Sequence, residues 1–238
     1  MVHNIIKSVL SRSDFLPSEQ DFFKFLKVRF STVGLDFDEV KSYLNSALEI
    51  SEERFILNKS KYYTSSDRLR AQFNSTHYSS HALILYQLAR ECFLDGRLDL
   101  AEKVYFLNVA TTATDLYYEV ELPIRTGCDH PLGSVIGRAR FEANSSLFFR
   151  QGCNIGGNRN DSGIPIYPEI KGSLYLNPRS SLIGDCTILG IVVLGNGAYV
   201  KNCEALENVV VFGTSPNLTI KPIKESLVHN SSVFLYEP

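Results

Sequence analysis

The chain has 238 residues, of which 44% are hydrophobic and 21% are charged, and its formal net charge at pH 7 is -2. This composition is that of a globular chain, since disordered and collagen-like sequences contain far fewer apolar residues. The small net charge argues against a nucleic-acid partner, because such binders carry a strongly basic surface. No apolar run approaches the ~18 residues that a membrane span needs, so we expect none.

The start of the chain, MVHNIIKSVLSRSD, has only a short apolar stretch that a lysine interrupts, so it does not resemble a signal peptide. The cysteines are odd in number, widely spaced and without a CxxC pair, which favours reduced thiols over disulfides or a metal site. They are Cys92, Cys128, Cys153, Cys186 and Cys203. These features predict a cytoplasmic protein without a bound metal.

Residues 1–118 are expected to form a helical amino-terminal domain. Apolar residues recur three and four positions apart in the segments 18–30, 36–50, 81–94 and 98–108. Gly96 and Arg97 separate the last two segments, and a glycine at this place suits a short turn between antiparallel helices. The length of the whole chain leaves room for this domain and one further core.

Residues 119–238 are expected to form a parallel β-helix, because a six-residue apolar period replaces the helical one after Pro123. The period runs through two sets of positions: Val135, Phe141, Leu147 and Cys153, and then Ile170, Leu176, Leu182, Ile188, Leu194 and Val200. Three six-residue faces close one coil of about 18 residues, and we expect roughly three and a half such coils followed by a carboxyl-terminal tail. The alternative, a sandwich of short strands, rarely keeps a constant spacing over such a distance.

A segment between the two runs, 154–167 with the sequence NIGGNRNDSGIPIY, is rich in glycine, asparagine, aspartate and proline. Such a composition marks a loop that leaves the coil. Loops on a rigid scaffold are common places for substrate contacts, so we expect a functional loop. The alternative is an insertion that a corner of the coil tolerates.

The segment 129–137, DHPLGSVIG, contains the only histidine of the repeat region, at the start of the regular coils. A neutral imidazole can accept a proton near pH 7, as a general base must. His130 is therefore a candidate catalytic base. The alternative is a histidine with a purely structural role.

Several segments together resemble the serine acetyltransferases, which are hexapeptide-repeat enzymes. The resemblance rests on Asp129-His130-x-x-Gly133-x-Val-Ile-Gly137, on Gly156-Gly157, on the extruded loop and on Tyr167-Pro168-x-Ile170. It extends upstream to His81-Ala-Leu and Gly96-Arg97, and downstream to Phe212-Gly213-Thr-Ser-Pro216. It spans roughly residues 80–221 and leaves out residues 1–75, whose role stays open.

The resemblance implies a left-handed β-helix, acetyl-CoA as cosubstrate, and a homotrimer or a dimer of trimers with active sites at subunit boundaries. It implies that His130 takes the proton of an acceptor hydroxyl, whose oxygen then attacks the thioester directly. Gly156 and Gly157 would let the backbone approach the pantetheine arm, since glycine has no Cβ. Basic residues near the last coils are candidates to contact the phosphates of coenzyme A, or are ordinary surface lysines: Lys201, Lys221 and Lys224.

The carboxylate that would orient His130 has two candidates. The family places an acid fifteen residues before its base, in an Asp/Glu-Ile-His-Pro or Glu-Ile-Pro context. Asp115 has this spacing, whereas Glu121 has the context in Glu121-Leu-Pro123 but lies only nine residues before His130. We favour Glu121. Asp129 matches an aspartate that contacts the amino-acid substrate in the family, and its alternative role is to cap a corner.

The segment Ile166-Tyr167-Pro168 departs from the family, which typically has Arg-His-Pro here. Ile166 cannot pair with a carboxylate, and Tyr167 offers a substrate only its hydroxyl. A free amino acid would lose a charge-assisted contact worth about 1.5–3 kcal/mol. Other cations are candidates to replace it, unless they are only solvated surface charges: Arg159, Lys171 and Arg179.

Three functions therefore remain in view. Serine O-acetylation would feed cysteine biosynthesis, and the helical domain and the His130 segment favour it. Acetylation of a sugar hydroxyl in a surface polysaccharide, such as capsule or O-antigen, is favoured by Ile166 and Tyr167. The third is a non-catalytic scaffold that has kept the β-helix fold and has lost turnover. Whether the carboxyl-terminal segment SSVFLYEP docks another protein stays open.

Overall fold

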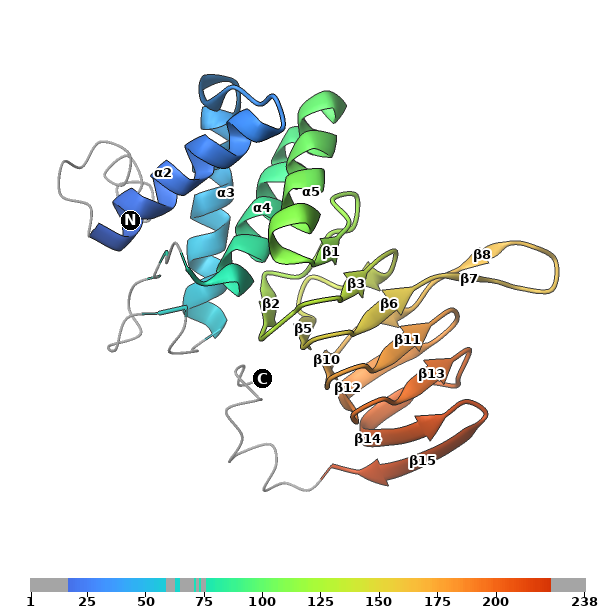
Figure 1. Ribbon diagram of the computed structural model, residues 1–238. Coiled ribbons are helices and arrows are strands. Elements are labelled where there is room, and N and C mark those ends of the chain that lie inside the picture. The colour runs from blue at the N-terminus through green and yellow to red at the C-terminus, as the bar shows by residue number, and fades with distance from the viewer. Residues whose placement is uncertain (1–16, 59–62, 65–70, 72, 74–75, 224–238) are drawn as a thin grey trace.

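The computed structural model describes residues 17–58, 63–64, 71, 73 and 76–223. Figure 1 shows a group of helices at the amino-terminal end, followed by a solenoid of stacked parallel strands. The predicted order, a helical region and then a left-handed parallel β-helix, is confirmed. Lys224 and the segment SSVFLYEP lie outside the described residues.

The helical region contains α2 (Pro17–Thr32), α3 (Phe37–Asn58), α4 (Tyr78–Leu94) and α5 (Leu98–Thr112). Helix α4 packs against both α3 and α5, and every residue from Ser79 to Ala89 is buried. A helix that is apolar on nearly all sides is expected at the centre of a bundle. The predicted turn is confirmed at Gly96, whose φ of 76° lies in the left-handed region that glycine adopts without strain.

The solenoid has three faces of stacked strands. One face consists of β2 (Arg125–Cys128), β5 (Ser146–Phe149), β10 (Ser173–Leu176), β12 (Thr187–Leu194) and β14 (Leu206–Thr214). The second consists of β1 (Asp115–Leu116), β3 (Val135–Ile136), β6 (Asn154–Gly156), β11 (Ser181–Ile183) and β13 (Tyr199–Lys201). The third is formed by β4 (Arg140–Phe141), β9 (Glu169–Ile170) and the first residues of β12 and β14.

The solenoid has about five turns, so the expected three and a half was too few. The first ladder strand, β1, pairs with β3 and begins at Asp115, before the expected domain boundary after residue 118. Its turn carries no six-residue period, which is why the sequence pattern missed it. The last strand, β15 (Asn217–Pro222), runs antiparallel to β14 and ends the described solenoid.

The six-residue period after the extruded loop is confirmed. Its six positions all point into the solenoid, and none is more than 1% exposed: Ile170, Leu176, Leu182, Ile188, Leu194 and Val200. Gly184 and Gly190, two residues after such positions, have φ values of 76° and 54°. These corners therefore need residues that tolerate the left-handed region, as the spacing predicted.

Three of the four positions assigned to the period before the loop are wrong, whereas Phe141 is correct, because it is paired with Ile170. Phe149, not Leu147, is the residue paired with Leu176, and Ile155, not Cys153, is paired with Leu182. Val135 is 40% exposed, whereas its neighbour Ile136 is buried. The corner after Phe141 holds two more residues than the corner after Ile170, which moves every later position of that turn.

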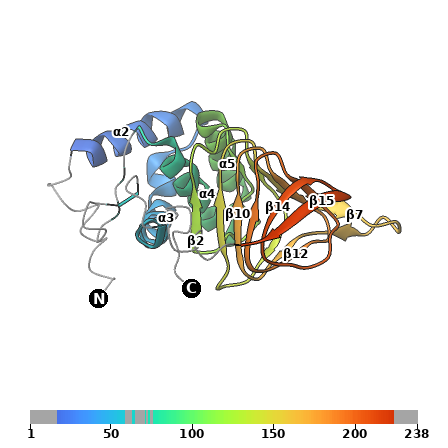
Figure 2. The same ribbon diagram turned by 90° about the horizontal axis from the view of Figure 1, so that it is seen from below.

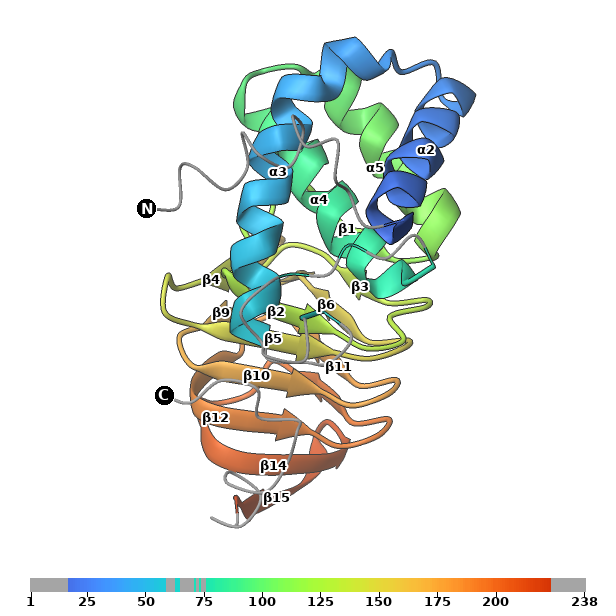
Figure 3. The ribbon, with the colours of Figure 1, turned by 90° about the vertical axis from the view of Figure 1, so that its left-hand side faces the viewer.

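The helical region is packed against the first turn of the solenoid (Figure 3). A Cβ on Gly127 of β2 would lie 1.9 Å from Nδ2 of Asn58 at the end of α3, so a larger residue here would require the Asn58 side chain to move. The buried hydroxyl of Tyr86 on α4 donates to the carbonyl of Val120 at 2.6 Å and accepts from the amide of Leu122 at 2.9 Å. These contacts fix the end of α3 and the middle of α4 relative to the first turn.

Candidate active site

His130 lies in a corner that is wider than the corners stacked on it (Figure 2 views the turns from below). Six residues separate Cys128 from Val135, whereas four separate the paired residues Phe149 and Asn154. The amide of Gly152 donates to the carbonyl of Leu132 at 2.9 Å, so the next corner stacks on the end of this one. The extra residues, His130 and Pro131, bulge out of the solenoid.

The bulge exposes the imidazole and strains its backbone. The side chain of His130 is 69% exposed, and its φ is 50°, in the left-handed region. A non-glycine residue in this region costs about 1–3 kcal/mol, although histidine, asparagine and aspartate enter it more often than others. A strained, exposed histidine is a reason to look for function at this corner.

Two side chains lie next to the imidazole of His130. Its Nδ1 is 2.8 Å from the hydroxyl oxygen of Tyr78, the first residue of α4. Its Nε2 is 3.5 Å from a carboxylate oxygen of Asp129, whose side chain is 35% exposed. The structure thus brings together Asp129 and His130, which were candidates from sequence, and adds Tyr78, which was not.

The surroundings of this corner are rich in titratable groups. His77 occupies the N-cap position of α4 without a capping side-chain hydrogen bond. Burial lowers its pKa, and the charge of Asp129 counteracts this shift. Burial and the charge of Asp129 raise the pKa of Tyr78, so its phenol is protonated at neutral pH. Burial likewise raises the pKa of Tyr63, which donates a hydrogen bond to the carbonyl of Cys128.

Glu121 and Asp115, the two candidates for an orienting acid, have other partners in this chain. Glu121 is 82% exposed and pairs with Nη2 of Arg90 at 3.1 Å. Asp115 accepts a hydrogen bond of 2.7 Å from the hydroxyl of Tyr105. In the described part of the chain, the carboxylate that approaches His130 is that of Asp129.

The extruded loop is confirmed as a hairpin of β7 (Asn158–Arg159) and β8 (Pro165–Ile166), which projects from the solenoid (Figure 1). At its base, the ring of Tyr167 packs on Gly157, where a Cβ would lie 2.5 Å from the ring. The hydrogen bond with Tyr167 raises the pKa of Arg138, which also pairs with Glu119 at 3.0 Å. Sequence reasoning missed Arg138, although it directly follows the 129–137 segment.

Gly156 and Lys201, two candidates for contacts with coenzyme A, lie at matching positions of stacked strands in the second face. Gly156 is paired with Ile183, and Ile183 with Lys201, so the two candidates are two strand spacings apart, about 10 Å. A Cβ on Gly156 would make only ordinary van der Waals contacts, the nearest at 3.7 Å from Cδ1 of Ile183, so a side chain would fit there. Lys221 lies on the closing hairpin instead, paired with Val210.

The suggested replacement cations have local partners or stacking roles. Arg159 donates to the carbonyl of Gly163 at 2.6 Å within the hairpin, and Lys171 lies 3.6 Å from Glu169. Arg179 has a φ of 63° and stacks on Gly152 at a corner. Arg138 also has a local partner, Glu119 at 3.0 Å, and it interacts with Tyr167 at the base of the loop.

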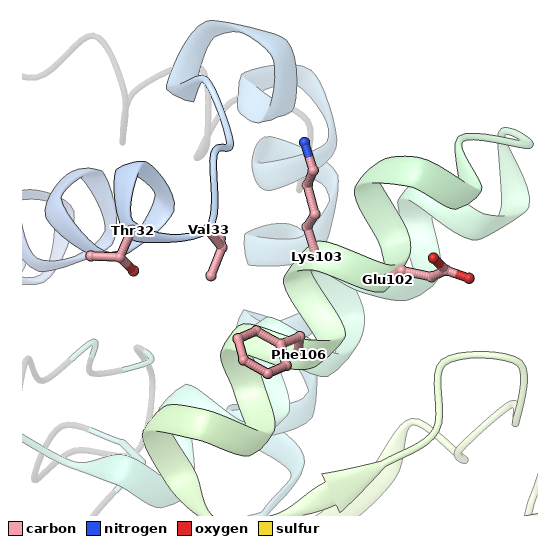
Figure 4. Close-up of a pocket in the computed structure, with 5 residues that line it drawn as sticks. All are labelled: Thr32, Val33, Glu102, Lys103 and Phe106. Carbon is pink, nitrogen blue, oxygen red and sulfur yellow. The ribbon is translucent and has the colours of Figure 1, made fainter.

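A separate pocket opens on the helical region (Figure 4). It is lined by residues at the end of α2 and along α5: Thr32, Val33, Glu102, Lys103 and Phe106. None of these residues belongs to the corner of His130. Within the described residues, no three or more histidine, cysteine, aspartate or glutamate side chains cluster as metal ligands would. No described helix has the length and hydropathy needed to cross a bilayer.

Comparisons with known proteins agree with this architecture. No protein-family profile matches the sequence, and no curated protein is significantly similar to it. A serine acetyltransferase from Neisseria gonorrhoeae in complex with serine superposes with a TM-score of 0.63 at 20% identity, over 94% of this chain and 90% of that one. One from Brucella abortus in complex with coenzyme A gives 0.54 at 17% identity, over 94% and 81%. The chain therefore has the fold of the serine acetyltransferases, both in its helical region and in its solenoid.

Proposed function

We propose that this protein is an acetyl-CoA-dependent O-acetyltransferase in which His130 is the general base. The observation that carries the proposal is the exposed, strained imidazole at the widened corner of this particular fold. Gly156 and Lys201 support it, because a backbone position without a side chain and an exposed cation lie on one line of the second face. A pantetheine arm and its phosphates would need both.

The chemistry follows from a neutral imidazole. His130 takes the proton of the acceptor hydroxyl while the oxygen forms a bond to the thioester carbonyl carbon. When the C–S bond breaks, the imidazolium returns that proton to the leaving thiolate, so no covalent acyl-enzyme is needed. Asp129, whose carboxylate lies 3.5 Å from Nε2, would carry a negative charge next to the imidazolium and would contact the acceptor. Backbone N–H groups would stabilise the oxyanion.

His130→Asn is the variant that tests this role. Asparagine enters the left-handed region more readily than alanine, so it fits a φ of 50° without adding strain. It cannot act as a base at neutral pH. We expect a folded protein whose acetyl transfer is at least a hundredfold slower, the usual lower range for losing a general base. An unchanged rate would rule out this mechanism.

L-serine is the first acceptor that we propose, and its product would enter cysteine biosynthesis. The support is that structural neighbours are serine acetyltransferases, one of them solved with serine. Ile166 cannot bind the serine carboxylate, but Arg138 is hydrogen-bonded to Tyr167 at the loop base and carries the required charge. Arg138 would then do the work of the missing basic pair, with Tyr167 as a second acceptor contact.

A sugar hydroxyl in capsule or O-antigen biosynthesis is the second candidate acceptor, favoured by Ile166 because a neutral sugar needs no carboxylate partner. Mass spectrometry distinguishes the two. Purified protein is incubated with acetyl-CoA and L-serine, and separately with nucleotide sugars and short glycans. O-acetylserine supports the first candidate, and an acetylated sugar without O-acetylserine supports the second. No product with any acceptor would favour the non-catalytic scaffold.

We further propose a homotrimer, or a dimer of trimers, in the cytoplasm. The support for assembly is that the second face of the solenoid carries exposed apolar side chains, Val135 at 40% and Tyr199 at 38%. The cytoplasm is proposed because the sequence has an odd number of widely spaced cysteines, which favours reduced thiols. Sedimentation velocity tests the assembly, and a monomer at micromolar concentration would contradict it.

A further inference from the structure

We infer that Tyr78 is a positioning residue for His130 and takes the place at Nδ1 that a carboxylate usually occupies beside a catalytic histidine. This inference rests on the proposed general-base role of His130. The observation is the 2.8 Å separation between the Tyr78 hydroxyl and Nδ1, together with the other partners of Glu121 and Asp115.

The two nitrogens of His130 cannot have the same role. A neutral imidazole carries one proton, so the nitrogen that accepts a proton from substrate must be the bare one. If Nδ1 keeps its proton and donates it to the Tyr78 oxygen, then Nε2 is bare and can act as the base. The carboxylate of Asp129 lies 3.5 Å from Nε2. This separation is longer than an ordinary hydrogen bond, so Asp129 does not favour the tautomer that carries its proton on Nε2.

The position of Tyr78 is well fixed by the fold. It is the first residue of α4, and the amides of Ser80 and His81 donate to the carbonyl of His77, which closes the first turn. The residues that follow on α4 are buried against α3 and α5. The rings of Tyr78 and His130 have centroids 6.4 Å apart and are tilted by 42°, so the contact is through the hydroxyl rather than by stacking.

The phenol of Tyr78 differs chemically from the carboxylate that usually lies beside a catalytic histidine. A protonated phenol is neutral, so it orients the imidazole and selects its tautomer while adding no negative charge next to it. The carboxylate of Asp129 lies on the other side of the ring, 3.5 Å from Nε2. In the proposed mechanism, orientation and charge stabilisation are divided between Tyr78 and Asp129.

Tyr78→Phe removes the oxygen and keeps the ring. We expect kcat to fall about tenfold with KM unchanged for both substrates, which corresponds to about 1.4 kcal/mol in the transition state. Nitrogen-15 NMR of ring-labelled histidine should show the proton of His130 on Nδ1 in the native protein, and a mixture of tautomers in Tyr78→Phe. A merely structural tyrosine would leave the tautomer unchanged.

Tyr43→Phe is the matched control, because it removes a phenol that donates to Asp95 at 2.5 Å in the helical region, away from His130. It should leave kcat and the His130 signals unchanged. Unchanged kcat in Tyr78→Phe, or a native protein with the proton on Nε2, overturns the inference even if His130→Asn is inactive. Full activity of His130→Asn instead overturns the proposed function. The NMR measurement on the native protein does not depend on how well the variant folds.

Discussion

Gly156 and Gly157 are neighbours in the sequence, yet the structure gives them different reasons to be glycine. A Cβ at Gly157 would collide with the ring of Tyr167 at 2.5 Å, whereas at Gly156 the nearest heavy atom would be 3.7 Å away. Gly157 therefore serves the packing of the loop base. Gly156 leaves free an outer surface that the proposed function assigns to the pantetheine arm.

Alanine at each position separates the two roles. Gly157→Ala should destabilise the protein by about 1–3 kcal/mol, the usual cost of overpacking, and lower its melting temperature. Gly156→Ala should keep the melting temperature and raise the KM for acetyl-CoA. Thermal unfolding and steady-state kinetics check both. Equal melting temperatures for the two variants would show that the Tyr167 ring moves aside at no cost.

The proposed role of Arg138 gives a testable prediction about the acceptor. If it binds the carboxylate of serine, Arg138→Gln should raise the KM for serine at least tenfold, because a charge-assisted hydrogen bond is worth about 1.5–3 kcal/mol. The KM for acetyl-CoA should not change. Arg140→Gln is the control, since Arg140 is also exposed and pairs with Glu169 at 3.2 Å. Equal effects in both variants would argue against a serine carboxylate at Arg138.

At the scale of elements, the stacking of turns depends on close backbone contacts at the corners. A Cβ on Gly172 would lie 2.0 Å from the carbonyl oxygen of Gly190 in the next turn. That atom belongs to backbone, which cannot move without shifting a whole turn.

Gly172→Ala should therefore unfold at a lower urea concentration than the native protein, with a loss of more than about 2 kcal/mol. Gly156→Ala, where the same methyl group fits, is the control for chemical denaturation. If Gly172→Ala keeps the native urea midpoint, the turns are packed less tightly at this corner than the structure shows.

The lengths of the corners determine how much of the fold could be predicted from the sequence. After the loop, each turn has equal corners, so Ile170 to Val200 keep a period of six and reveal the β-helix. Before the loop, the corners at 129–134 and 142–146 are longer, and the period breaks. Counting positions cannot detect such insertions, because an apolar residue lies close to the expected place in either case.

The site was predicted only where its residues are close in sequence. Asp129 and His130 are adjacent, so a motif could reveal them. Tyr78 reaches His130 across fifty-two positions, and Arg138 reaches Tyr167 across the base of a loop. Such pairs arise from the docking of α4 on the first turn and from the folding of the hairpin, neither of which leaves a local pattern.

At the scale of the whole molecule, buried thiols and a buried phenol predict that the free energy of unfolding falls at alkaline pH. Burial raises the pKa of Cys92 and of Cys128 to about 12, and that of Tyr175 to about 12. The unfolded chain loses these protons at lower pH, from about 9 upward for the thiols. Above that pH the folded state binds more protons than the unfolded state, so stability decreases as pH rises through the range from about 9 to about 12.

Urea denaturation between pH 7 and pH 11 tests this dependence. The midpoint should be nearly constant up to about pH 8.5 and fall steadily above it. Cys128→Ser should not be used as a control, since a hydroxyl changes the packing against Tyr63. A midpoint that stays constant to pH 11 would mean that water reaches these groups in the folded protein.

The central claim is that this solenoid transfers acetyl groups through His130, and one measurement addresses it most directly. Acetyl-CoA labelled with carbon-13 in the acetyl group is incubated with native protein and with His130→Asn, each with L-serine and with the glycan panel, and products are followed by mass spectrometry. The account predicts a labelled O-acetyl ester with the native protein and at least a hundredfold less with the folded variant. Equal amounts of labelled ester from both proteins would contradict it.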